Sequence, residues 1–286
     1  MEKEFLKSLG AREKDISILE EYFRNPFIIP EPGKEPACDI EFLKAWERIF
    51  DHAAAKSAAD ALNRYMVPVE RYMTFEEPDL VELVLHHTPV GGIPVIKAGC
   101  QKDFETLVVQ IIYKGKRPQG LESTGASFAY GKKTRFIILS NKDYSNVPAE
   151  EIGITEEEWK DKSMKIRLEH ECTHYFTKQV LGSSRNNLYD ECIADFFGIL
   201  YAFGEYRAEW FLSFLGLRGI SGRRLKFYMN ELPEETHEVV SRTAVLAAES
   251  LEKWSRSKIF SEMDDYRRKL WLCSRSICEW CQGGLE

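Results

Sequence analysis

Five consecutive residues, His170-Glu171-Cys172-Thr173-His174, constrain this chain more than any other part of it. On an α-helix, residues four positions apart lie on one face, one turn apart, so the two imidazoles can converge on one metal ion. Glu171 then lies beside that face, where its carboxylate can take a proton from a metal-bound water. The spacing therefore predicts a metal site with two histidine ligands and a general base.

The residues around this motif predict a long helix. Thr155 and Glu158 form a capping-box pattern, which begins helices, and acidic residues in a first turn favour them further. No Pro or Gly follows until Gly182, a residue type that commonly ends helices. We therefore expect a helix over residues 155–181, with both histidines in its interior.

A second helix is predicted after a short polar loop. Asn187 suits the N-cap position, and Glu191 and Asp195 follow on one face of the helix. If this helix returns antiparallel to the first, Glu191 can lie opposite the two histidines. Two histidines and a glutamate are a known ligand set for catalytic zinc, which keeps its fourth position for water or substrate. Asp195 can accept the outward ring N–H of a liganding histidine and so fix its tautomer.

The H-E-x-x-H motif, followed by Glu191-x-x-Ala194-Asp195, resembles the gluzincin branch of the zincin metallopeptidases. The compact spacing is similar to that of the CAAX-prenyl endopeptidases, although nothing in the chain looks like their transmembrane helices. The resemblance covers about residues 155 to 202. The roles that it implies are Zn²⁺ ligation by His170, His174 and Glu191, general-base catalysis by Glu171, and orientation of a ligand by the buried carboxylate of Asp195.

By this resemblance the chain would be a cytoplasmic zinc peptidase that hydrolyses a peptide or a specific protein. Zinc lowers the pKa of its bound water and polarises the scissile carbonyl, while Glu171 carries the proton to the leaving amine. Gluzincins generally use a downstream His or Tyr to stabilise the oxyanion. His237, at an apparent helix start, is the first candidate, and Tyr228 and Tyr201 are alternatives.

Other interpretations stay open. The histidines and the carboxylate could form a buried polar network without metal, although the additional Glu191 and Asp195 pair favours metal. A regulatory protein of zincin fold could bind zinc and a protein partner without turnover, but the presence of Glu171 favours catalysis. Hydrolysis of a non-peptide amide is a third interpretation.

The composition excludes several classes of function. Lys and Arg number 39 against 46 Asp and Glu, a net charge of −7, which argues against nucleic acid as a partner. One local basic cluster is expected to be a solvated face; it comprises Arg218, Arg223, Arg224 and Lys226.

No segment approaches the roughly 18 apolar residues of a membrane span, and the charged N-terminus lacks the apolar region of a secretory signal. Seven cysteines, an odd number, fit reduced thiols in a cytoplasm. The oligomeric state is left open.

Three regions follow one another along the chain. Residues 1–75 are predicted to be helical, residues 80–146 to form strands, and the chain from residue 155 onward to be helical again. The predicted fold class is α+β and zincin-like, with a small, mostly antiparallel sheet followed by the active-site helix and a helical C-terminal half. We expect an N-terminal helical region, 1–75, and a metallopeptidase domain, 76–286, or one continuous domain.

The strand region contains three predicted strands, at residues 80–85, 106–113 and 135–139. Residues 123–130 are a candidate edge strand that could pair with extended substrate, or an ordinary loop and strand. His86 and His87 are adjacent, so they point to opposite faces of a strand and cannot both reach one zinc ion. We expect them to be structural.

Three cysteines lie near the C-terminus: Cys273, Cys278 and Cys281. The Cys278-x-x-Cys281 spacing could indicate structural zinc or redox chemistry, but a closed zinc site needs four ligands, and no obvious fourth is nearby in sequence. Helical spacing places five residues on one face: Leu270, Cys273, Ile277, Trp280 and Cys281. We therefore expect a docking C-terminal helix with cysteines as small core residues.

Overall fold

The computed structural model describes residues 2–31, 33, 40–131, 134–185 and 187–285. The chain divides into two compact units: a sheet unit, residues 37–144, and a helical unit, residues 1–36 with 145–286. The expectation of helices combined with one small sheet is confirmed. The predicted boundary after residue 75 falls inside the sheet unit, and the division into functional domains stays a prediction.

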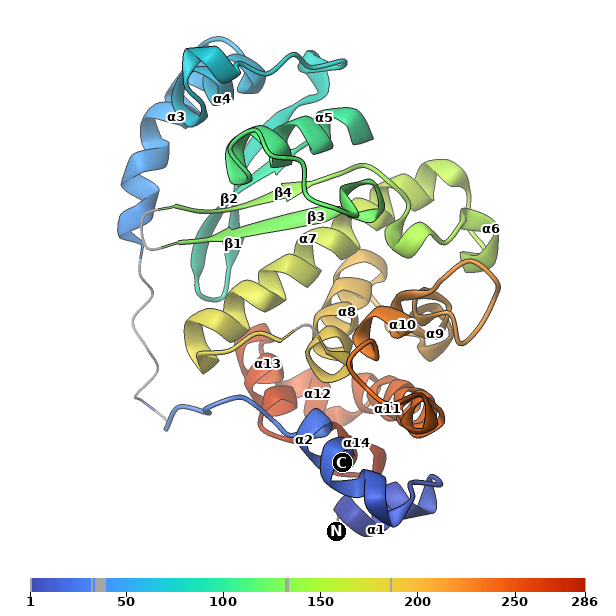
Figure 1. The fold of residues 1–286 in the computed structure, drawn as a ribbon. Helices are drawn as coiled ribbons and strands as arrows, with labels where there is room; N and C mark the ends of the chain where they lie inside the picture. The colour runs from blue at the N-terminus through green and yellow to red at the C-terminus, as the bar shows by residue number, and fades with distance from the viewer. Residues whose placement is uncertain (1, 32, 34–39, 132–133, 186, 286) are drawn as a thin grey trace. The chain divides into compact units, whose positions relative to one another are not determined.

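The sheet unit contains a four-stranded sheet of order β1-β2-β4-β3 (Figure 1). The strands are β1 (Glu82–Thr88), β2 (Gly91–Lys97), β3 (Ala126–Tyr130) and β4 (Arg135–Leu139). β1 pairs antiparallel with β2 and β3 antiparallel with β4, whereas β2 and β4 are parallel. The sheet is thus mostly antiparallel, and β3 is an edge strand. A role for β3 in binding substrate stays a prediction.

One of the three predicted strands is wrong. The strand at 135–139 is confirmed as β4, and β1 begins two residues later than predicted. Residues 106–112 are instead helical, because α5 (Gln101–Leu107) continues into a π-helical turn, Val108–Ile112. The buried carboxylate of Asp103 accepts hydrogen bonds from the backbone N–H groups of Glu76 and Glu77. This anchor, together with burial of the apolar side of the turn, overrides the β-propensity of the Val and Ile residues.

Two further helices complete the core of the sheet unit. They are α3 (Lys44–Ala55) and α4 (Ala58–Met66), and Ser57 caps α4 by accepting a hydrogen bond from the Asp60 N–H. Trp46 of α3 is almost fully buried and lies 5.4 Å from the ring of Phe136 on β4, measured between ring centroids. Aromatic packing of this kind attaches the helices to the sheet.

The helical unit contains the remaining helices. They are α1 (Glu2–Ser8), α2 (Ile16–Phe23), α6 (Ala149–Ile152), α7 (Glu156–Leu181), α8 (Leu188–Phe203), α9 (Ala208–Leu215), α10 (Arg224–Tyr228), α11 (His237–Ser255), α12 (Lys258–Glu262), α13 (Asp265–Cys273) and α14 (Ile277–Cys281). The first and last helices lie side by side (Figure 1). The Ser276 hydroxyl donates a hydrogen bond to the Glu2 carboxylate. Among the described residues, no helix combines the length and the apolar character that crossing a bilayer requires.

The C-terminal cysteines are part of the core, as predicted. Cys273 and Cys278 are buried, Cys281 is partly buried, and none of the three forms a disulfide. The expected single helix is broken by a turn, because Ser276 starts α14 with its own capping box to Glu279.

Candidate metal centre

Helix α7 carries the H-E-x-x-H motif and has the predicted limits. The Thr155 hydroxyl accepts a hydrogen bond from the Glu158 N–H, and the Glu158 carboxylate accepts one from the Thr155 N–H. At the other end Gly182 adopts φ 73°, a left-handed conformation that glycine adopts without strain. Both histidines therefore project from the helix interior, about two turns or more from either end.

Helix α8 returns against α7 and is buried along most of its length. Asn187 is its N-cap, and its side chain accepts a hydrogen bond from the Asp190 N–H at 3.1 Å. The two backbones approach closely at Gly198, where an added Cβ would lie only 2.8 Å from the Ile166 carbonyl oxygen. Glycine at this position allows the close packing that brings Glu191 to the histidines.

His170, His174 and Glu191 converge on one point, as the sequence predicts, with ligand atoms within 4.8 Å of one another. The two Nε2 atoms are 3.1 Å apart. Glu191 Oε2 lies 3.5 Å from Nε2 of His170, and Glu191 Oε1 lies 3.6 Å from Nε2 of His174. Three potential metal-binding groups thus share one small volume.

An aspartate faces the outward nitrogen of each imidazole. Asp195 Oδ1 is 2.7 Å from His170 Nδ1, the contact predicted for this carboxylate. Asp190 Oδ2 is 3.5 Å from His174 Nδ1, slightly beyond hydrogen-bond length, and the sequence reasoning did not single out Asp190. A proton held at Nδ1 leaves the Nε2 of a neutral ring with an outward lone pair. Two such lone pairs facing each other repel unless a proton or a metal ion lies between them.

The position of Arg224 on α10 differs most from the prediction. Its guanidinium bridges two carboxylates: Nη2 lies 2.7 Å from Glu191 Oε2, and Nη1 lies 2.8 Å from Asp195 Oδ2. Its Nε donates to the Tyr228 hydroxyl at 2.7 Å, and that hydroxyl donates to Glu191 Oε2 at 2.9 Å. The expectation that Arg224 belongs to a solvated basic face is wrong, because its side chain is mostly buried among these partners.

The electrostatics of the centre favour ionised carboxylates and positive charge beside them. Burial opposes charge on Glu191, but the imidazoles and Arg224 outweigh it and hold the pKa of Glu191 below its usual value. Burial likewise opposes charge on His174, but Asp190 and Glu191 outweigh it and raise the pKa of His174 well above its usual value. For Asp195, burial is outweighed by Arg224 and His170, so the pKa of Asp195 is lowered. Ionised carboxylates therefore surround the imidazole nitrogens.

The predicted base and oxyanion donors lie in different surroundings. Glu171 is partly exposed on α7. His237, at the start of α11, donates from Nε2 to the Leu232 carbonyl rather than to the three converging residues. Tyr201 is about half exposed. Of the three candidate oxyanion donors, Tyr228 is the one that contacts Glu191.

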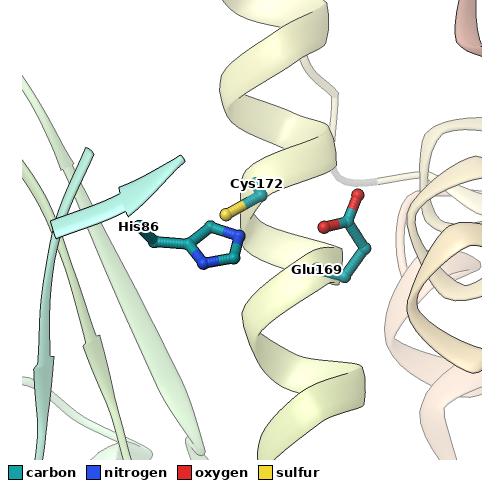
Figure 2. Close-up of side chains that lie close together, drawn as sticks. All are labelled: His86, Glu169 and Cys172. Carbon is teal, nitrogen blue, oxygen red and sulfur yellow. The ribbon is translucent and has the colours of Figure 1, made fainter. Parts of the chain in front are cut away.

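A buried ion pair fixes the other side of α7. Lys269 on α13 is 1% exposed, and its Nζ lies 2.8 Å from Glu169, which directly precedes the motif, and 2.8 Å from Asp265. Figure 2 shows Glu169 one turn from Cys172 on α7. Burial raises the pKa of the Cys172 thiol well above its usual value, which keeps the thiol protonated.

The N-terminal helix α2 is hydrogen-bonded to both α8 and α10. The Tyr22 hydroxyl accepts from the Leu188 N–H at 3.2 Å and donates to the Tyr228 carbonyl at 3.1 Å. The Tyr22 carbonyl accepts from the Asn187 side chain at 3.3 Å. One tyrosine therefore connects the first turn of α8 with the end of α10.

A known protein family matches the chain. The family is described as "Family of unknown function (DUF7005)", and its profile matches residues 67–134 and 130–280. None of the curated proteins and none of the solved structures compared with the chain matches it. The family match includes all of α7, α8 and α10 and covers more than half of the sequence. The chain therefore belongs to the family of unknown function DUF7005.

Proposed function

We propose that the chain is a zinc-dependent peptidase of gluzincin type, with His170, His174 and Glu191 as the metal ligands. The observation that carries the proposal is the pair of Nε2 atoms 3.1 Å apart in rings whose Nδ1 atoms face Asp195 and Asp190. Carboxylates behind metal-binding histidines fix the ring tautomer and strengthen the imidazole as a ligand. Such an arrangement favours a metal ion over a polar network without one.

The residues present fit zinc. A tetrahedral site with bonds of about 2.0–2.1 Å has ligand atoms about 3.3–3.4 Å apart. The two Nε2 atoms are 3.1 Å apart and Glu191 Oε1 lies 3.6 Å from His174 Nε2, so both separations agree with that edge within a few tenths of an ångström. Two histidines and a glutamate also leave a fourth position for water or substrate, which is the pattern of catalytic rather than structural zinc.

In the proposed mechanism, the residues around the metal site have different roles. Bound zinc would supply an acidified water and a polarised scissile carbonyl. Glu171, which is partly exposed, would accept the proton at its carboxylate and deliver it to the leaving amine. Asp195 orients the imidazole of His170, and Asp190 faces Nδ1 of His174.

The resemblance and the order of elements support the same function. The chain has a small sheet before the long motif-bearing helix and a helical region after it, the order expected of zincins. The net charge of −7 favours a peptide or protein substrate over nucleic acid. The alternative is a regulatory protein that binds zinc and a partner without turnover, and the accessible Glu171 favours the peptidase.

The decisive experiment compares three variants of the full chain for bound zinc and for cleavage of a peptide library. Glu171→Gln is expected to keep zinc and lose cleavage, His174→Ala to lose both, and Glu157→Gln, exposed on the first turn of α7, to change neither. Cleavage that survives Glu171→Gln would refute the assigned base. Zinc without cleavage in the unaltered chain would favour the regulatory alternative, and absence of zinc after metal addition would refute both.

A further inference from the structure

Two residues on one short helix hold the same oxygen of Glu191. Arg224 and Tyr228 lie one turn apart on α10, and both donate to Oε2, from Nη2 at 2.7 Å and from the hydroxyl at 2.9 Å. They also bond to each other, because Arg224 Nε donates to the Tyr228 hydroxyl at 2.7 Å. Each oxygen faces one imidazole: Oε1 lies 3.6 Å from His174 Nε2, and Oε2 lies 3.5 Å from His170 Nε2. The two oxygens differ in that Oε2 is the one that accepts the hydrogen bonds from Arg224 and Tyr228.

We infer that Arg224 and Tyr228 are positioning residues that engage Oε2 of Glu191 and leave Oε1 as the oxygen offered to a metal ion, an inference that rests on the proposed metal site. A carboxylate can bind a metal through one oxygen or through both. Two charge-assisted or short hydrogen bonds to Oε2 oppose the two-oxygen mode. A ligand held to one oxygen keeps the coordination number low and the water position open.

The Arg224 guanidinium also contacts the carboxylate that orients His170. Arg224 Nη1 bonds Asp195 Oδ2 at 2.8 Å, while Asp195 Oδ1 accepts from His170 Nδ1 at 2.7 Å. One planar group thus fixes the carboxylate of a ligand and the carboxylate that orients another ligand. A lysine at position 224 would keep the charge, but it lacks the fork that bonds two carboxylates at once.

The positioning role proposed for Arg224 and Tyr228, here called bracing, differs from the role of a simple counter-ion. If Arg224 only neutralised Glu191 and Asp195, its removal would leave the ligand geometry unchanged and would strengthen metal binding, since a competing cation is lost. If Arg224 and Tyr228 brace Glu191, their removal frees Oε2 and changes the coordination of the metal. The coordination geometry therefore separates the two roles, and affinity alone does not.

The test uses Co²⁺ added to the metal-depleted full chain, because the visible bands of Co²⁺ are strong in four-coordinate sites and weak at higher coordination number. The variants are Arg224→Gln, Arg224→Lys and Tyr228→Phe, with Arg223→Gln, exposed just before α10, as the matched control. We expect Arg224→Gln and Arg224→Lys to lose roughly half or more of the molar absorptivity, and Tyr228→Phe to lose less in the same direction. Arg223→Gln should match the unaltered chain.

Two results would overturn the inference while leaving the metal site intact: identical Co²⁺ spectra in all variants, or an Arg224→Lys spectrum like that of the unaltered chain. Tyr228→Phe removes one hydroxyl without unpairing a buried charge, so it decides the question if Arg224→Gln does not fold. If the unaltered chain binds no Co²⁺ at all, the proposed metal site itself fails, and the bracing role fails with it.

Discussion

Replacing Lys269 by Met should destabilise the helical unit by about 3 kcal/mol. The ammonium is almost completely buried, 2.8 Å from Glu169 and 2.8 Å from Asp265, and lies 4.1 Å from the ring centroid of Phe197. Burial opposes its charge, but the two carboxylates outweigh burial and raise the pKa of Lys269. Removing one partner of a buried ion pair costs about 3–5 kcal/mol, because the other charge is left buried and unpaired.

The lower end of that range applies for two reasons. Asp265 is about half exposed, so its pairing with Lys269 at i and i+4 contributes only about 0.3–0.5 kcal/mol. Burial also raises the pKa of Glu169, so this carboxyl can take up a proton once the lysine is gone and part of the penalty is relieved. The free energy of unfolding of a folded domain is typically about 5–15 kcal/mol, so a loss of about 3 kcal/mol would still be a large fraction of it.

The assay is urea unfolding at 25 °C with a chelator present, so that metal binding does not contribute. Glu169→Gln and the double variant complete a cycle, and we expect a coupling energy of about 0.5–3 kcal/mol between the two sites. Lys258→Met, at an exposed lysine of α12, is the control and should change the free energy of unfolding by no more than about 0.5 kcal/mol. Additive single effects, or a loss below about 1 kcal/mol for Lys269→Met, would refute the reasoning.

Three further outcomes are expected. Asp195→Asn should weaken zinc binding about 10- to 100-fold, because His170 loses the carboxylate that orients it. Zinc affinity would be measured by competition with a chelator, and an unchanged affinity would contradict this role of Asp195. Asn187→Ala should lower the free energy of unfolding by about 1 kcal/mol through loss of the cap to the Asp190 N–H, measured by urea titration, and no change would contradict the capping role. Cys281 should react slowly with iodoacetamide at neutral pH, since burial raises the pKa of its thiol to about 12, and rapid labelling by mass spectrometry would count against that environment.

The helix pair at the candidate site could be predicted because its signals are local. Thr155, Gly182 and Asn187 mark the ends of α7 and α8 through contacts within a few residues of sequence. The spacing of the motif then fixes which side chains share a face. Local signals of this kind depend little on the rest of the fold, so they identified both helices and the convergence of His170 with Glu191.

The errors arose where distant contacts decide the structure. Residues 106–113 have the composition of a strand, but the buried Asp103 carboxylate and the packing of α5 against its own unit make residues 106–112 helical. Arg224 stands in a run of basic residues, and nothing in that run indicates a partner 33 residues earlier in the chain. Asp190 could have been suggested by its position beside Glu191, in the first turn of α8.

The hydrogen bonds of Tyr22 bear on how this protein is trimmed for study. A fragment cut to the span of the family match, residues 67–280, would retain every proposed ligand and the whole of the recognisable motif. It would nevertheless lack the phenol that joins the beginning of α8 to the end of α10. An inactive truncated fragment would therefore say little about the intact chain, and the first 23 residues belong in any preparation used to assay it.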